Sequence, residues 1–218
     1  RVFCNYGGIL NDLGKPQEAV ISFRKSIELK PDFADLHSNL GIILKDLGKL
    51  QEAELSTRKA IELNPDFAQA YSNLGIILRE LGKLQEAEIS YRKSIELKPD
   101  YAEAYSNLGS ILRDLGKLQE AELSTRKAIE IKSDYAEAHS NLGIILKDIG
   151  QLQEAELSYR KAIQINPDFA EAHSNLGNLL NDLGKLQDAE LSYRKAIEIK
   201  PDYAEAYSNL GIILKNLG

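Results

Sequence analysis

The tetrapeptide Ser38-Asn39-Leu40-Gly41 recurs every 34 residues along this chain. A constant short period of this kind is typical of a solenoid, in which each unit buries its apolar face against its neighbours. The pattern therefore predicts a repeat array rather than a domain with one central core. The later copies begin at Ser72, Ser106, Ser140, Ser174 and Ser208, and Cys4-Asn5-Tyr6-Gly7 is a diverged first copy.

The composition limits the classes of partner. Hydrophobic residues make up 43% of the 218 residues and charged residues 28%, which argues against disorder. A net charge of −6 argues against nucleic acid, whose binding needs a basic face. Because no apolar run is long enough to span a membrane, no membrane partner is expected. The single cysteine, Cys4, allows no internal disulfide, so we expect a reducing, cytoplasmic location. Without an initiator Met or a signal peptide, the chain reads as a segment of a longer protein.

The period divides the chain without any linker. Numbering each repeat from the alanine four residues before the recurring serine makes residues 1–33 an incomplete first repeat. Residues 204–218 form the first helix of a last repeat. The five complete repeats between them span 34–67, 68–101, 102–135, 136–169 and 170–203.

Each repeat is predicted to hold two antiparallel helices. The first is expected to begin at a step such as Asp100-Tyr101-Ala102-Glu103, where the Asp caps the helix and the Glu completes a capping box. It ends at a glycine such as Gly48, which suits the left-handed position after a helix. A proline such as Pro65 stops the second helix, and the short turns place the two helices side by side.

A second glycine of each repeat, such as Gly75, lies inside the first helix and costs about 1 kcal/mol relative to Ala. We expect a close helix crossing to offset that cost, with the alanine at repeat position 20, such as Ala87, as the partner. The second helices carry Glu→Arg pairs four residues apart, which indicate a solvated outer face. These pairs include Glu88–Arg92, Glu122–Arg126 and Glu156–Arg160.

The repeat resembles a known family. In repeat 68–101 the signature residues stand at repeat positions 4, 7, 8, 20, 24 and 32, and they are Tyr71, Leu74, Gly75, Ala87, Tyr91 and Pro99. This set resembles the tetratricopeptide repeat signature, and the resemblance covers the whole chain. It implies an all-α, right-handed superhelical solenoid of antiparallel helix pairs, with positions 2, 5, 6, 9, 12 and 13 of the first helices lining a concave groove.

On that resemblance the groove carries rows of like residues, with a serine row at position 5. The candidate peptide-binding residues are Asn39, Asn73, Asn107, Asn141, Asn175 and Asn209 at position 6, Ile42, Ile76 and Ile144 at position 9, and Lys45, Arg79, Arg113 and Lys147 at position 12. A similar asparagine ladder stands at position 6 in the tetratricopeptide superhelix of O-linked N-acetylglucosamine transferases.

An asparagine amide both donates and accepts hydrogen bonds, so it can hold a peptide backbone. Helix layers lie about 10 Å apart and an extended peptide advances about 3.3 Å per residue, so one asparagine meets about every third peptide residue. The serine and asparagine rows have no evident packing role, which favours ligand contact. The alternative is that the asparagines are only solvated or bond a neighbouring helix.

These features predict a non-catalytic scaffold whose mildly acidic groove binds a neutral or basic extended segment of a protein. The alternatives are a structural or self-assembling spacer that associates end to end, and the substrate-recruiting arm of a larger enzyme such as a glycosyltransferase. No cofactor is expected. His37, His139 and His173 stand in different repeats, so we interpret them as packed, hydrogen-bonded side chains rather than metal ligands.

Overall fold

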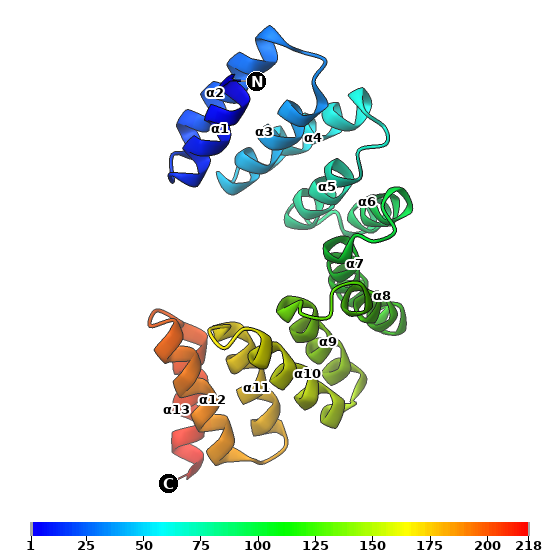
Figure 1. Cartoon of the computed structure of the whole chain (residues 1–218). Helices are drawn as coiled ribbons and strands as arrows, with labels where there is room; N and C mark the ends of the chain where they lie inside the picture. The colour runs from blue at the N-terminus through cyan, green and yellow to red at the C-terminus, as the bar shows by residue number, and fades with distance from the viewer. Residues whose placement is uncertain (1, 218) are drawn as a thin grey trace. The chain divides into compact units, whose positions relative to one another are not determined.

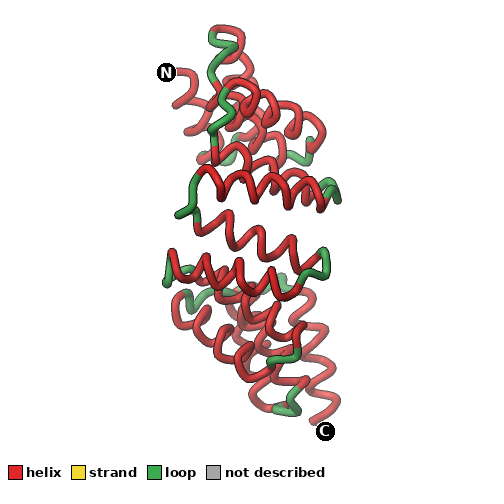
Figure 2. Tube along the Cα trace, turned by 90° about the vertical axis from the view of Figure 1, so that its right-hand side faces the viewer, coloured by secondary structure: helices red, strands yellow, loops and turns green. Residues whose placement is uncertain are grey.

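The structure, a computed structural model, describes the backbone of residues 2–217 and the side chains of residues 7–217. Over residues 2–217 every regular element is an α-helix, and short turns join the helices (Figures 1 and 2). The all-α prediction is therefore confirmed. The side chains of Cys4 and Asn5 lie outside the described residues, as does Gly218, which stands at the same repeat position as the turn glycine Gly48.

The thirteen helices described alternate between first and second helices of a repeat. The first helices are α1 Val2–Asp12, α3 Ala34–Asp46, α5 Ala68–Glu80, α7 Ala102–Asp114, α9 Ala136–Ile149, α11 Ala170–Asp182 and α13 Ala204–Leu217. The second helices are α2 Pro16–Leu29, α4 Leu50–Leu63, α6 Leu84–Leu97, α8 Leu118–Ile131, α10 Leu152–Ile165 and α12 Leu186–Ile199.

The chain forms two compact units, Arg1–Ile111 (unit 1) and Leu112–Gly218 (unit 2). In unit 1, α1 packs on α2, α3 on α4 and α5 on α6; in unit 2, α9 packs on α10 and α11 on α12 (Figure 1). Within each unit a second helix also packs on the next first helix, as α2 does on α3, α4 on α5, α8 on α9, α10 on α11 and α12 on α13. Each unit is thus a stack of helix pairs, the arrangement of an α-solenoid.

The turn glycines have the predicted left-handed conformation. Gly48, for example, has φ +72°. Its N–H bonds the Lys45 carbonyl at 2.8 Å and the next N–H, of Lys49, reaches back to the Leu44 carbonyl at 2.8 Å. These bonds satisfy carbonyls that the end of α3 would otherwise leave unpaired.

The predicted aspartate caps are wrong at α3, α5, α9 and α11, where the N-cap is aromatic and no side chain caps the helix. The N-cap of α5 is the aromatic residue Phe67, and no side chain caps this helix start. Asp66 lies one residue earlier, in the turn, where its own N–H bonds the Asn64 side-chain oxygen at 3.2 Å. The aspartate therefore belongs to a turn that the asparagine organises, and its carboxylate does not cap the helix.

The atoms nearest to the mid-helix glycine belong to the side chain at position 24 rather than to the expected alanine, although at Gly41 the Ala53 carbonyl oxygen would also lie 3.2 Å from an added Cβ. A Cβ added to Gly75 would lie 2.6 Å from the ring of Tyr91, at repeat position 24. The same relation holds between Gly143 and Tyr159 at 2.6 Å. The Tyr91 ring is 1% exposed, so the glycine makes room for a buried aromatic side chain. Burying that ring offsets the helix-propensity cost of the glycine.

First helices are the more closely packed layer within each unit. The helix α3 contacts α5, and α11 contacts both α9 and α13, whereas no two second helices of one unit pack as closely. Each unit therefore curves toward its first helices. We call the side formed by positions 2, 6, 9, 12 and 13 of the first helices the inner face, and the exposed side of the second helices the outer face.

Candidate functional site

The inner face is continuous across neighbouring helices of each unit, because ion pairs connect them. In unit 1, Lys45 of α3 lies 3.8 Å from the Glu80 carboxylate of α5. In unit 2, Arg113 bonds Asp148 at 2.5 Å, and a further pair joins Lys147 to Asp182 at 2.7 Å. The position-12 cation of one repeat thus meets the position-13 carboxylate of the next.

These ion pairs also reduce the positive charge that the Lys and Arg residues at position 12 can offer a ligand. Lys45, Arg113 and Lys147 are half-buried and already hold carboxylates, while Arg79 is exposed. A ligand therefore meets a row that is largely neutralised by its own neighbours. The aliphatic row at position 9 is half-buried beside it, at Ile42, Ile76 and Ile144.

The predicted asparagine row divides into three environments. Asn39 is exposed, and Asn107, Asn141, Asn175 and Asn209 are half-buried. Asn73 is buried, with only 6% of its surface exposed. Its amide donates to the Ser38 hydroxyl of the neighbouring first helix at 3.1 Å and accepts from Gln69 at 3.0 Å. Asn73 therefore takes the alternative role of bonding a neighbouring helix.

The serine row does not line the inner face as expected. Ser38, Ser72, Ser106, Ser140 and Ser174 are each at most 3% exposed. Position 5 falls where successive first helices meet, as the bond from Asn73 of α5 to Ser38 of α3 shows. A small hydroxyl fits this close contact, so packing does account for the serines.

A polar pocket of about 170 Å³ opens on the inner face of unit 2. Asn178 lines this pocket, and its side-chain oxygen accepts a hydrogen bond from the Tyr193 hydroxyl at 2.6 Å and another from the Asn209 amide at 2.9 Å. Asn181 also lines the pocket. Burial raises the pKa of Tyr193 to about 12, so its phenol stays protonated and donates near neutral pH.

Sequence reasoning did not identify this pocket as a site, although a signal was present. Asn178 stands where most repeats have Ile, and Asn181 where most have Lys or Arg. Together with Asn175 they place three amides on one side of α11 at three-residue spacing.

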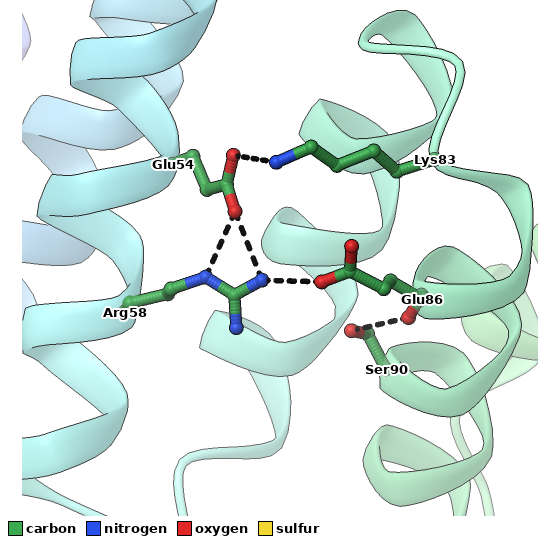
Figure 3. Close-up of polar contacts among 5 residues, drawn as sticks. All are labelled: Glu54, Arg58, Lys83, Glu86 and Ser90. Atoms are coloured by element: carbon green, nitrogen blue, oxygen red, sulfur yellow. Dashed lines mark hydrogen bonds and ion pairs between the residues drawn. The ribbon is translucent and has the colours of Figure 1, made fainter.

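The predicted Glu→Arg pairs of the second helices are confirmed, and they extend between repeats. Arg58 bonds Glu54 on its own helix at 2.9 Å and Glu86 on α6 at 2.7 Å, while Lys83 holds the other Glu54 oxygen at 2.7 Å (Figure 3). Burial raises the pKa of the Glu54 carboxyl, but the bonds from Lys83 and Arg58 outweigh it and lower that pKa. The outer face therefore carries ion-pair networks that join successive repeats.

The three histidines are packed and hydrogen-bonded, as expected. Each Nε2 donates to a backbone carbonyl six residues earlier: His37 to Pro31 at 2.9 Å, His139 to Ser133 at 3.0 Å and His173 to Pro167 at 3.0 Å. Among the described residues, no group of His, Cys, Asp and Glu side chains is arranged to hold a metal ion. None of the described helices has the length and apolar character needed to cross a bilayer.

Comparison with protein-family models decides the family. Models of the TPR repeat match residues 7–48, 145–184 and 177–218, and models of the tetratricopeptide repeat match residues 34–67 and 66–134. The chain belongs to the tetratricopeptide repeat family. Tetratricopeptide repeat proteins act as protein-binding scaffolds, and this chain has their all-α solenoid fold.

Solved tetratricopeptide structures agree with this assignment. YrrB, a TPR protein with an unusual peptide-binding site, is 26% identical; the match covers 85% of this chain and 96% of YrrB, with a TM-score of 0.62. TTC0263, a thermophilic TPR protein from Thermus thermophilus, is 24% identical over 84% of this chain and 99% of its own, with a TM-score of 0.72.

The type IV pilus biogenesis factor PilW is 19% identical, covers 96% of this chain and 97% of its own, and has a TM-score of 0.87. At their identities, PilW and TTC0263 show the likeness of the fold alone. A search of curated proteins finds no match to this chain.

Proposed function

We propose that the chain is a non-catalytic binding module whose inner face holds the backbone of an extended peptide. The observation that carries the proposal is the row of asparagine amides on successive first helices. In unit 2 further amides, those of Asn178 and Asn181, line a pocket beside this row. YrrB, the similar TPR protein, has a peptide-binding site, which supports the same class of ligand. An amide row that donates and accepts suits a backbone more than any particular side chain.

The charge of the inner face favours a neutral or basic peptide. The position-12 cations are paired with position-13 carboxylates, so their charge is largely offset. Carboxylates at position 2, such as Asp35 and Glu137, are exposed beside the amide row. The net charge that remains on the inner face is negative, which disfavours an acidic peptide.

Amide removal tests the proposal. The probes are fluorescein-labelled extended peptides of about twelve residues, long enough to cross about four helix layers, prepared in basic, neutral and acidic forms. We expect Asn141→Ala with Asn175→Ala to weaken binding of the basic peptide by about tenfold, since two backbone contacts of about 0.5–1.5 kcal/mol each are lost. Fluorescence anisotropy measures the Kd.

The control variant is Gln153→Ala, which removes an exposed amide from the second helix α10 and should leave the Kd unchanged. N-methylation of the peptide backbone should weaken binding, while scrambling its side-chain order should not. Equal binding by the wild type and the double asparagine variant would refute the backbone-ladder proposal.

A further inference from the structure

The outer face carries a row of exposed aliphatic side chains. One residue at repeat position 22 of each second helix is between 66% and 71% exposed. The fold does not need these side chains, because they point away from the buried contacts, and a repeated exposed apolar side chain marks an interaction surface. The members of this row are Ile21, Leu55 and Ile89 in unit 1, and Leu123, Leu157 and Leu191 in unit 2.

In unit 2 the row borders two grooves. Because second helices stand farther apart than first helices, a gap opens between each pair, and the first helix between them forms its floor. The first groove, of about 450 Å³, lies between α8 and α10 over His139 and Leu142. The second, of about 430 Å³, lies between α10 and α12 over His173 and Leu176.

The two grooves have similar volumes but differ in charge. Two cations, Arg126 and Lys161, and two carboxylates, Glu130 and Glu154, line the α8–α10 groove. The corresponding cations Arg160 and Lys195 line the α10–α12 groove, and no carboxylate is among its lining residues. Its remaining lining residues are Ile163, Gln164, His173, Leu176, Leu191 and Ser192.

Two substitutions remove the carboxylates. Gln164 stands at the repeat position of Glu130, so one wall of the groove loses its acid. Asp188 stands at the position of Glu154 and is one methylene shorter. A longer acid at that position reaches the arginine of the previous repeat, as Glu154 reaches Arg126 at 3.0 Å.

Arg160 has lost the corresponding contact. Within the described part of the chain it bonds Glu156, on its own helix, at 2.8 Å. Lys195 pairs at 2.8 Å with Glu198, which is 69% exposed and does not line the groove. An exposed pair of this kind is worth about 0–1 kcal/mol, so a ligand carboxylate can compete for the lysine.

We propose that the α10–α12 groove docks an acidic amphipathic helix of a protein partner. An apolar side chain of that helix packs on Leu176 and Leu191, and carboxylates beside it meet Arg160 and Lys195. The cation-rimmed apolar lining selects this occupant, because a basic segment would meet like charge and a purely apolar one would leave the cations without new partners. This site is on the opposite side of the helix pairs from the inner face.

The groove suits a helical occupant. A helix laid between α10 and α12 presents side chains three, four and seven residues apart on one side, so they can pack on Leu176 and Leu191 together. This is the helix-in-groove mode of peptide recognition.

Charge-matched peptides test the proposal. The probes are fluorescein-labelled amphipathic helical peptides with Leu at positions i, i+3 and i+7 and with Glu, Gln or Lys at the flanking positions. We expect the Glu peptide to bind at least about tenfold tighter than the Lys peptide at low salt, and we expect added salt to reduce the difference. Fluorescence anisotropy gives the Kd of each peptide.

Matched variants locate the binding. Leu191→Ser, at an exposed position, should remove most binding without unfolding the chain, which circular dichroism verifies. Gln164→Glu restores the missing carboxylate and should weaken binding of the Glu peptide by about three- to tenfold. The mirror change Glu130→Gln should strengthen binding at the α8–α10 groove, and Asn175→Ala on the inner face should change nothing.

Three results would overturn the proposal. One is equal binding of the Glu and Lys peptides, and another is binding that Leu191→Ser leaves intact. The third is sedimentation showing a Leu191-dependent dimer, which would make a second copy the occupant. Because the inner face is proposed to favour a basic peptide, the Glu and Lys peptides are compared in the Asn141→Ala, Asn175→Ala variant, so that the two proposals fail independently.

Discussion

At the scale of single residues, the side chain at position 24 determines whether a glycine of the first helix can be replaced. Gly75 faces the Tyr91 ring, and an added Cβ would lie 2.6 Å from it. Gly211 occupies the same repeat position in α13, is exposed, and would place its Cβ in open space. Packing therefore requires glycine at position 75, whereas no described side chain packs against Gly211.

Alanine substitution distinguishes the packed glycine from the unpacked one. We expect Gly75→Ala to destabilise the chain by about 1–3 kcal/mol, because the methyl group overpacks a buried ring. Gly211→Ala should stabilise α13 by up to about 1 kcal/mol, because it removes the propensity cost of glycine. Urea denaturation followed by circular dichroism measures both. A loss of stability in Gly211→Ala equal to that in Gly75→Ala would contradict this account.

At the scale of helices, ion pairs connect second helices that do not pack directly on each other. Glu156 of α10 receives Lys185 at 2.8 Å and Arg160 at 2.8 Å. The bond from Lys185 lowers the pKa of Glu156 most, the bond from Arg160 lowers it further, and burial opposes both. The ionised carboxylate is therefore favoured in the folded state.

The lowered pKa of Glu156 predicts that its ion pairs contribute less to the stability of the fold in acid. Since the folded pKa lies below the ordinary value of about 4.3, the stabilisation is complete above that value and is lost as the pH falls through the lowered pKa. Glu156→Gln should reduce the melting temperature at neutral pH and reduce its further fall between about pH 5 and pH 3. Calorimetry at several pH values measures the effect.

Glu190 provides the matched control, since it occupies the same position in α12 and bonds Arg194 at 2.8 Å without a second cation among the described residues. Its replacement by Gln should change the acid dependence less. If the melting temperature of Glu156→Gln depended on pH as that of the wild type does, the Lys185–Glu156 contact would not be the source of the acid sensitivity.

At the scale of the whole molecule, stability should be distributed along the array. A repeat contacts only its neighbours, so unfolding can be local. Leu146, in unit 2, is 1% exposed and belongs to a core with Leu176, Leu180 and Tyr193. Leu44 holds the same repeat position in unit 1 and is 2% exposed.

Truncating these leucines tests that distribution. We expect Leu146→Ala to cost about 2–5 kcal/mol and to lower hydrogen-exchange protection mainly in α9–α12, while α3 and α4 keep theirs. Leu44→Ala should produce the reverse pattern. Exchange detected by mass spectrometry resolves the helices. Uniform loss of protection in both variants would indicate one cooperative unit instead.

Local features of the sequence were sufficient for most of the fold. Left-handed glycines such as Gly48 end first helices, prolines such as Pro65 follow second helices, and the i,i+4 pairs form as predicted. Each of these depends on contacts within a few residues, which the order of residues along the chain specifies directly. The asparagine positions on the first helices were also predictable, because helical periodicity places them on one side.

The sequence by itself thus determined the repeat, its two helices and the presence of an amide row. Only the tertiary structure decided that the position-5 serines from Ser38 to Ser174 are buried, that Asn73 bonds Ser38, and that the Tyr91 ring occupies the space beside Gly75. It also revealed the α10–α12 groove and its missing carboxylates. The physical reason is that these features depend on how closely neighbouring helices approach, and that separation is set by packing across repeats rather than by the local sequence of either helix.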